Sequence, residues 1–316
     1  MIKVLLLLVL LNPLNCMAWE LAGLGHYQFE AVNANVYVMH GPLQEPSKQN
    51  QGFMNNPGII VTTNGVVLVD PGSTYHVGRQ ILSEIKKITN KPILAVFNSH
   101  IHGDHWLGNQ AVKEAYPHAK IYAHPNMIEQ ANTGIGSDWL TIMKTLTEGE
   151  SQGTKIVAPD NAIKQGDVII IDGQHFKVYA YDPAHTNTDV LIEHVESKTL
   201  FMGDNSFNKR MARFDSSSNM HGSISLLKAI KKLDIKTYIP GHGQSGDFNA
   251  AVKPFMDYLT RLQAIVKTGY DQDLEDYEIK TVANKELQEY HAWPGFEEQF
   301  GKHVFKMYLE IQKQAF

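Results

Sequence analysis

The sequence has one cysteine, Cys16, among 316 residues. It lies in an N-terminal segment with the features of a secretory signal peptide: a positive start at Lys3, an unbroken apolar run from Val4 to Leu11, and a small-x-small ending at Ala18. Cleavage after Ala18 removes the thiol, so the mature chain forms no disulfide and offers no thiolate to a metal ion. We therefore expect a secreted or periplasmic protein with a signal peptide over residues 1–18. An uncleaved N-terminal anchor and a lipoprotein signal at Cys16 are the alternatives.

Long hydrophobic runs and basic runs are also scarce. No later apolar run approaches the ~18 residues of a membrane-spanning helix. No run of Lys and Arg exceeds two residues and the net charge is -5, which disfavours nucleic acid as a partner. The expected partner is a small-molecule substrate. Hydrophobic residues make up 43% of the chain and charged residues 19%, which excludes disordered and collagen-like classes.

Strand and helix patterns alternate along the chain from Gly58 to Leu200. The expected strands are 59–61, 66–69, 92–97, 120–123, 168–171, 176–181, 189–193 and 199–202. The expected helices are 76–88, 109–116, 125–131, 138–146 and 223–233. This alternation predicts a layered α/β protein with mixed sheets.

Two apolar stripes with helical spacing follow in the last part of the chain, from Phe255 to Val266 and from Phe296 to Ile311. We expect one catalytic domain over residues 19–250 and a helical extension over residues 251–316 that packs on it. The alternative for the stripes is a lid or a surface that pairs copies of the chain into an oligomer.

Three of the fifteen histidines lie within six residues, in the segment Ser99-His100-Ile101-His102-Gly103-Asp104-His105. The segment follows an expected strand and precedes an expected helix, so it is a loop of the kind that carries functional residues. His100 and His102 are two residues apart, which places both imidazoles on one side of an extended segment. Asp104 and His105 follow after the chain turns. The four side chains can supply two nitrogens to one metal ion, and an oxygen and a nitrogen to a second.

Three more residues with metal-binding side chains, His185, Asp204 and His242, lie in polar turns at the ends of expected strands. Taken alone, each could cap a turn. Taken with the first cluster, they predict the remaining ligands of a metal site.

These motifs, in this order, resemble the metallo-β-lactamase-fold hydrolase superfamily. The resemblance rests on H-x-H-x-D-H at 100–105, the isolated His185, Gly203-Asp204 and Gly241-His242, with Asp70-Pro71-Gly72 and Gly108-Asn109 as flanking elements. It covers roughly Gly58 to Gly243 and implies a four-layer αβ/βα sandwich with the metal ions at one edge of the paired sheets. Within the superfamily, the sequence is similar to quinoprotein-relay-type zinc metallohydrolases.

The resemblance also implies a ligand set. It puts His100, His102 and His185 on metal one, puts Asp104, His105 and His242 on metal two, and makes Asp204 the bridge. Three neutral imidazoles with an open position are typical of catalytic zinc, so two zinc ions are the expected cofactors. Iron or manganese is the alternative, because a hard bridging carboxylate tolerates them. Asp104 is also expected to be the catalytic carboxylate.

Other residues near the motifs are candidates for substrate binding. They are Trp106, Phe207, Lys209, Arg210 and His221. Arg213 lies on the same expected loop after Asp204 as Phe207, Lys209 and Arg210. The alternatives are packing for Trp106, a structural role for His221 and a solvated charge run for the basic residues. Asp189 is expected to support His185 from behind.

We expect an exported dinuclear zinc hydrolase whose metal-bound hydroxide attacks an ester, thioester, lactone or amide-like bond. The best-known β-lactamases of this fold carry Cys where this chain has Asp204, which resembles the glyoxalase II and lactonase branches instead. A β-lactamase and an iron-dependent redox enzyme on the same fold are the enzymatic alternatives. A non-catalytic zinc-binding module is the alternative outside enzymes.

Overall fold

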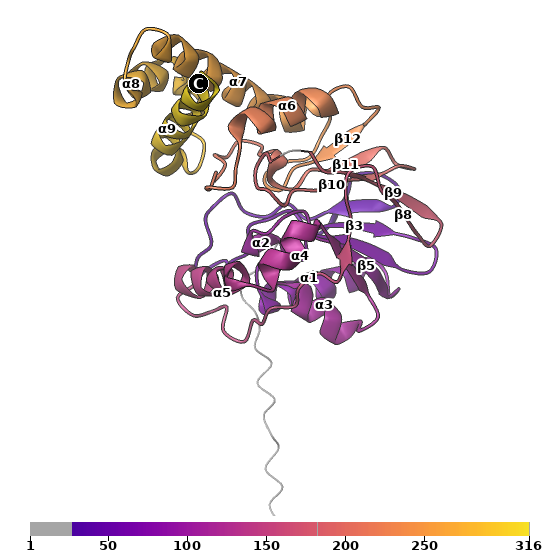
Figure 1. The fold of residues 1–316 in the computed structure, drawn as a ribbon. Helices are drawn as coiled ribbons and strands as arrows, with labels where there is room; N and C mark the ends of the chain where they lie inside the picture. The colour runs from indigo at the N-terminus through magenta and orange to yellow at the C-terminus, as the bar shows by residue number, and fades with distance from the viewer. Residues whose placement is uncertain (1–26, 182, 316) are drawn as a thin grey trace, which may run out of the picture.

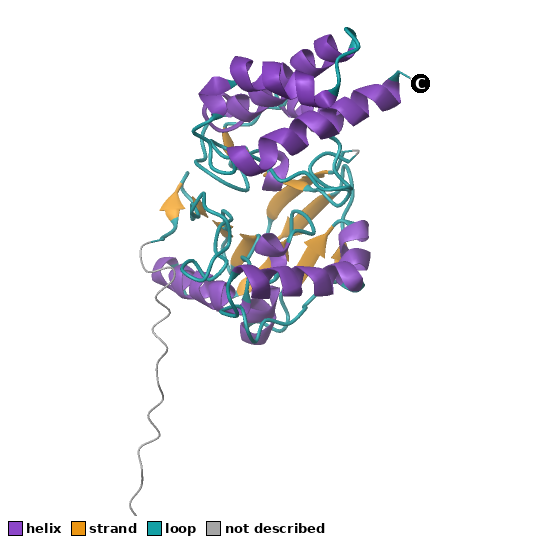
Figure 2. Cartoon of the chain, turned by 90° about the vertical axis from the view of Figure 1, so that its left-hand side faces the viewer, coloured by secondary structure: helices purple, strands orange, loops and turns teal. Residues whose placement is uncertain are grey.

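The computed structural model describes residues 27–181 and 183–315. The expected signal peptide lies outside the described residues. Two sheets face each other in the middle of the molecule, and helices cover the outer face of each (Figures 1 and 2). This is the four-layer αβ/βα sandwich that the motifs predict, and helices α7–α9 follow it at the C-terminal end (Figure 1).

The first sheet has seven strands in chain order. They are β1 (Glu30–Ala31), β2 (Val36–Val38), β3 (Gly58–Val61), β4 (Val66–Val69), β5 (Ile93–Phe97), β6 (Lys120–Ala123) and β7 (Asn161–Ala162). Pairing is antiparallel up to β4 and parallel from β4 to β7. In the β3–β4 hairpin Ile59 pairs with Leu68, as two β-branched runs around a Thr-Asn-Gly turn predict.

The second sheet has five strands in the order β12-β11-β10-β9-β8. They are β8 (Val168–Ile171), β9 (Gln174–Tyr179), β10 (Leu191–His194), β11 (Thr199–Phe201) and β12 (Thr237–Ile239). Only β11 and β12 pair in parallel, which brings their carboxyl ends together. Strand β9 begins two residues before the predicted strand, because Asp172 and Gly173 both adopt positive φ and close a tight hairpin there.

Five helices cover the first sheet: α1 (Tyr75–Ile88), α2 (Gly103–Trp106), α3 (Asn109–Ala115), α4 (Pro125–Ala131) and α5 (Gly134–Leu146). Helix α1 begins where the Thr74 side chain accepts a hydrogen bond from the Val77 backbone. Its buried Val77, Ile81 and Ile85 recur at helical spacing and pack on the sheet. Helix α5 begins four residues before the predicted start at Asp138.

Four helices lie on the second sheet's side: α6 (Met220–Ile230), α7 (Lys253–Tyr270), α8 (Asp276–Glu286) and α9 (Phe296–Gln314). Short turns η1 (Gly203–Asn205), η2 (Phe248–Val252) and η3 (Gln288–Tyr290) complete the described helices. No helix in the described part of the chain is both long and apolar enough to cross a membrane.

Three layers of apolar side chains hold these elements together. Between the sheets, Phe97 packs on Phe176 with ring centroids 5.4 Å apart. Outside the first sheet, Leu68 packs against Ile81 of α1. Truncating one such side chain to alanine typically costs about 2–5 kcal/mol.

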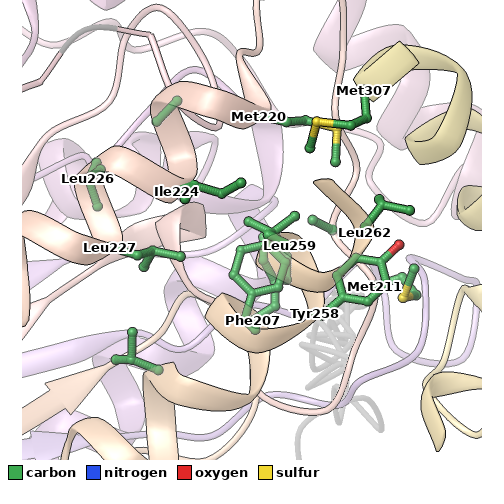
Figure 3. Close-up of a cluster of buried hydrophobic side chains, with 14 of the residues drawn as sticks. Phe207, Met211, Met220, Ile224, Leu226, Leu227, Tyr258, Leu259, Leu262 and Met307 are labelled. Carbon is green, nitrogen blue, oxygen red and sulfur yellow. The ribbon is translucent and has the colours of Figure 1, made fainter. Parts of the chain in front are cut away.

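The third layer joins the second sheet to α6, α7 and α9 and contains most of the two predicted C-terminal stripes (Figure 3). Tyr258 and Leu259 of α7 and Met307 of α9 are fully buried in it. The stripes are therefore used in packing within the chain. The large exposed apolar side chains on α8 and α9 are Tyr277, Val282, Phe305 and Leu309. An oligomer formed through the C-terminal helices stays a prediction.

Candidate metal centre

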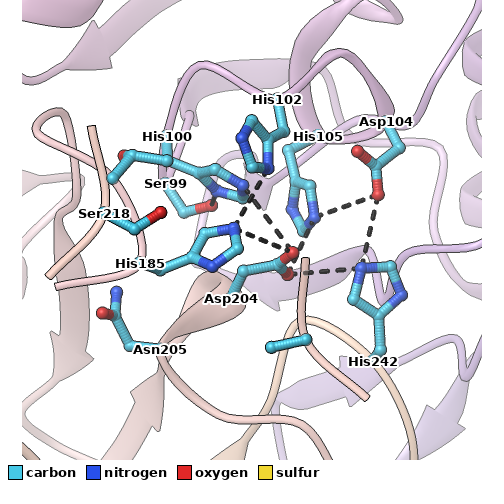
Figure 4. A network of polar contacts seen from close by, with 12 residues as sticks. Ser99, His100, His102, Asp104, His105, His185, Asp204, Asn205, Ser218 and His242 are labelled. Carbon is cyan, nitrogen blue, oxygen red and sulfur yellow. Dashed lines mark hydrogen bonds and ion pairs between the residues drawn. The ribbon is translucent and has the colours of Figure 1, made fainter. Parts of the chain in front are cut away.

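The predicted ligands come together at one edge of the paired sheets, in the loops next to the strand ends (Figure 4). His100 and His102 follow β5, Asp204 follows β11, His242 follows β12, and His185 precedes β10. Because β4 runs parallel to β5 and β11 runs parallel to β12, the carboxyl ends of both strand pairs can present side chains to the same place. All seven predicted ligands are buried.

The first group of side chains is His100, His102, His185 and Asp204, whose ligand atoms lie within 4.8 Å of one another. His102 Nδ1 is 3.0 Å from His185 Nε2. Asp204 Oδ2 is 3.4 Å from His185 Nε2 and 3.8 Å from His100 Nε2.

The second group is Asp104, His105 and His242. Asp104 Oδ2 lies 3.3 Å from Nε2 of each histidine. The other oxygen of Asp204, Oδ1, lies 3.0 Å from His105 Nε2 and 3.3 Å from His242 Nε2. Asp204 therefore presents one oxygen to each group, which is the arrangement of a bridging carboxylate.

The donor set fits two divalent ions. His100 Nε2, His105 Nε2 and Asp204 Oδ1 are buried and have no hydrogen-bond partner among the described residues. Buried polar atoms without partners are costly, and lone pairs that converge from several elements are satisfied together by a cation. Nitrogen and carboxylate ligands in these numbers suit zinc, iron or manganese better than calcium or magnesium.

Hydrogen bonds on the side away from the centre orient the rings of three histidines. His100 Nδ1 is 2.9 Å from Ser99 Oγ, and His105 Nδ1 is 2.8 Å from Asp70 Oδ2. His102 is turned the other way: its Nε2 is 3.2 Å from Asp215 Oδ2, so its Nδ1 faces the centre. Such outer partners orient a metal-binding imidazole and set its tautomer.

His242 Nδ1 has two close neighbours, the Met54 carbonyl at 2.9 Å and Arg210 Nη1 at 3.2 Å. Both cannot be hydrogen bonds, because a carbonyl only accepts and a guanidinium only donates. We assign the bond to Met54, since a ring that faces the centre with Nε2 carries its proton on Nδ1. The Arg210 Nη1 group then lies beside His242 without bonding to it.

Backbone geometry beside the centre is tight and partly strained. Asp70 has φ 53°, unusual for a non-glycine residue, and its carboxylate also accepts hydrogen bonds from the Ser99 N–H at 2.8 Å and hydroxyl at 2.7 Å. A Cβ at Gly241 would lie 2.1 Å from Asp204 Oδ1. Only glycine at 241 allows the β12 loop to approach the bridging carboxylate so closely.

Burial and neighbouring charges shift the pKa values of the site residues in opposite directions. Burial lowers the pKa of His100 well below its usual value, and burial lowers the pKa of His185 to about 3. Burial opposes ionisation of Asp204, yet the charges of His242 and His105 hold the pKa of its carboxyl well below the usual range. At the second group the carboxylates outweigh burial: Asp204, Asp104 and Asp70 hold the pKa of His105 well above its usual value, and Asp204 raises the pKa of His242. A divalent ion bound there would take the place of these protons, because metal ligation requires neutral imidazoles and ionised carboxylates.

The residues expected to bind substrate divide into two sets. Phe207 and Arg210 line the pocket beside the centre, as Arg213 also does. Trp106 and His221 do not line it: Trp106 is fully buried and donates a hydrogen bond to the Ile101 carbonyl at 2.7 Å. His221 Nδ1 is instead 2.9 Å from Glu310 of α9, and Lys209 is exposed outside the pocket.

Four further residues contribute to the site without any sequence motif that marks them individually. They are Asp215 behind His102, Glu45 paired with Arg210 at 2.7 Å, and Trp139 and Met143 of the pocket wall. Asp189 differs from expectation: it accepts hydrogen bonds from the Thr186 N–H and hydroxyl rather than from His185.

Comparison with known proteins agrees with this geometry. The family model of the metallo-beta-lactamase superfamily matches residues 51–242. A probable metallo-hydrolase of Streptococcus pyogenes is 36% identical over 67 residues, 21% of this chain and 27% of that protein. A hydroxyacylglutathione hydrolase of Francisella tularensis subsp. holarctica is 24% identical over 196 residues, 61% of this chain and 64% of that protein. The chain thus spans less than two thirds of the length of either relative.

Among solved structures, an inverting sec-alkylsulfatase from a Pseudomonas species shares the fold, with a TM-score of 0.70 and 18% identity. The match covers 89% of this chain and 50% of that one. Helix α7 begins at Lys253, and residues 1–252 make up less than 89% of the chain. The structural match must therefore include part of the C-terminal helices.

Proposed function

Because this chain belongs to the metallo-beta-lactamase superfamily, we propose that it is an exported, dinuclear zinc-dependent hydrolase that cleaves an ester, thioester, lactone or amide-like bond. The observation that carries the proposal is the pair of ligand groups that share the two oxygens of Asp204. When bound, two divalent ions supply an acidified water as nucleophile and a Lewis acid for the carbonyl oxygen.

The protein's own side chains account for ligand geometry and for proton handling. His100, His102 and His185 would hold metal one, while Asp104, His105 and His242 would hold metal two. Asp104 also lines the pocket, where a carboxylate can accept a hydrogen bond from water and orient it toward a substrate. We therefore assign it the role of catalytic carboxylate.

The pocket chemistry favours a small substrate with an apolar body and an anionic group. Its wall is largely apolar, through side chains that include Met54, Trp139, Met143 and Phe207. Arg210 is neutralised by Glu45, whereas no ion pair or hydrogen bond of the Arg213 side chain occurs among the described residues. Arg213 is thus the cation free to meet an anionic group.

A substrate screen on purified mature protein, with its metals counted, tests the function. The panel contains a thioester, an aryl ester, a lactone, a β-lactam and an alkyl sulfate. We expect the protein to turn over an acyl substrate and His102→Ala to lower that turnover at least 100-fold. Replacing residues that only orient a metal ligand already lowers activity about 10–100-fold. A protein that binds both ions and turns over none of these substrates would contradict the proposal. Turnover of the β-lactam as fast as the other substrates would favour the β-lactamase alternative. One iron ion per chain would favour the redox enzyme.

Alkyl sulfate hydrolysis is a second candidate, favoured by the fold likeness that extends into the C-terminal helices. Preferential turnover of the alkyl sulfate over every acyl substrate would replace the acyl proposal with this one. Aryl and alkyl esters of equal chain length serve as matched controls for the apolar part of the substrate.

Export is proposed from the sequence of residues 1–18. Mass spectrometry of the periplasmic fraction should find a chain that begins near Trp19. An intact Met1, or a lipid on Cys16, would contradict simple secretion.

A further inference from the structure

The loop between η1 and α6, residues 206–219, carries much of the pocket. It contributes Phe207, Arg210, Met211 and Arg213 to the lining. It also contributes Asp215, which bonds to the back of the metal-binding His102. Most of this segment has no regular secondary structure, so its shape has to be imposed by its neighbours.

One face of α9 makes polar contacts with the loop at two points and with the start of α6 at a third. His303 Nε2 lies 2.9 Å from the Ala212 carbonyl, and Lys306 Nζ lies 3.0 Å from the Asp215 carbonyl. Glu310 accepts hydrogen bonds from the backbone N–H groups at the start of α6, at 2.9 and 3.1 Å. Positions 303, 306 and 310 are three and four residues apart, so they share one helix face.

Apolar contacts reinforce this face. Met307 of α9 lies against Met220 of α6 in the same buried cluster, and Met211 of the loop lies beside Tyr258 of α7 (Figure 3). The Phe214 ring meets the His303 ring edge to face with centroids 5.2 Å apart.

His303 uses both ring nitrogens. The Tyr258 hydroxyl is 2.8 Å from Nδ1, while Nε2 bonds to Ala212. Burial lowers the pKa of His303 to about 4, so near neutral pH the ring has the one donor and the one acceptor that these two partners need. Replacing the ring by an apolar side chain would leave a buried carbonyl and a buried hydroxyl unpaired.

We propose that His303 is a positioning residue for the metal centre: with Tyr258 behind it, it holds the Ala212–Asp215 segment so that Asp215 orients His102 and Arg213 faces the pocket. The inference rests on the proposed function in that it takes the centre to bind divalent ions. It makes the C-terminal helices part of the active-site architecture.

Zinc affinity, measured by competition with a chelator in the full-length mature protein, tests this independently of turnover. His303→Leu removes both hydrogen bonds, and Tyr258→Phe removes only the outer one. His303→Gln can keep a donor for Ala212 and an acceptor for Tyr258. We expect His303→Leu to lower the affinity for one of the two zinc ions about 10-fold and Tyr258→Phe to lower it less. His303→Gln should have nearly the wild-type affinity.

A double-variant cycle shows whether the effect passes through Asp215. If it does, His303→Leu combined with Asp215→Ala should weaken zinc binding no more than Asp215→Ala alone. Val304→Ala, a buried apolar change on the same helix, serves as the control for general destabilisation. It should lower the melting temperature without changing zinc affinity.

Two results would overturn the proposal: unchanged zinc affinity in His303→Leu that is folded, or additive losses in the double variant. If His303→Leu does not fold, the milder Tyr258→Phe decides by the same measurement. If the wild-type protein binds two zinc ions yet turns over nothing, the proposed function fails while this comparison still stands.

Discussion

Asp204 is the residue on which the two metal groups depend. Its Oδ2 faces His185 at 3.4 Å and its Oδ1 faces His105 at 3.0 Å. We expect Asp204→Asn, which keeps the size and removes the charge, to weaken the second ion while His100, His102 and His185 retain the first. A zinc titration of both proteins measures this. A variant with unchanged stoichiometry and affinity would mean that Asp204 only caps the turn after β11.

Arg213 is the residue that should select the anionic group of the substrate. We expect Arg213→Gln to raise the KM for an anionic substrate about 10-fold, in line with the ~1–3 kcal/mol of a lost charged hydrogen bond, and to leave a neutral ester nearly unchanged. Lys209→Gln is the matched control, because Lys209 lies on the same loop but outside the pocket. Equal effects of both variants on KM would point to a general charge effect instead.

At the residue scale, the sequence predicts ligands better than it predicts substrate contacts. Metal ligation demands particular residue types, so His100 to His105 and the three later ligands carry a recognisable pattern. A wall residue needs only to be apolar and correctly placed. Trp106 satisfies its own indole N–H within the core, whereas Trp139, 33 positions later by residue number, lines the pocket. Asp215 meets His102 across 113 positions, which no local pattern reveals.

At the scale of elements, the strands beside the centre were predictable because they are buried β-branched runs that end in turns. The helix α8 was not, because its fully buried apolar side chains are limited to Ile279 and Ala283 and its start depends on a capping box between Glu275 and Glu278. The two-residue strands β1 and β7 carry too little pattern to be found and are ordered by pairing with longer neighbours.

Helix α9 should carry a measurable pH dependence through His303. The pKa of the His303 ring is about 4 in the folded protein and about 6.5 in the unfolded chain. Between these pH values, only the unfolded state binds a proton at His303. The His303 contribution to stability therefore falls as the pH drops from 6.5 to 4, by up to roughly 3 kcal/mol. Urea unfolding of metal-free protein at several pH values should show the wild type losing its advantage over His303→Gln in this range. Parallel pH curves for the two proteins would contradict the assignment.

For the molecule as a whole, one buried cluster joins the second sheet, α6 and the C-terminal helices. Leu200 of β11 and Met202, which follows that strand, share this cluster with Phe255 and Leu259 of α7. A chain that ends at residue 250 should therefore expose a large apolar surface and aggregate. Size-exclusion chromatography and circular dichroism of the truncated protein check this. A soluble, folded monomer would show instead that residues 19–250 form an independent domain.

The number of divalent ions bound per chain tests the central claim most directly, since every functional argument depends on one centre shared by two ions. Calorimetric titration of the metal-free mature protein with zinc, checked by elemental analysis, should give two ions per chain, and His102→Ala should lose the tight binding of one. A wild-type stoichiometry of one ion or none under zinc-replete conditions would contradict the account.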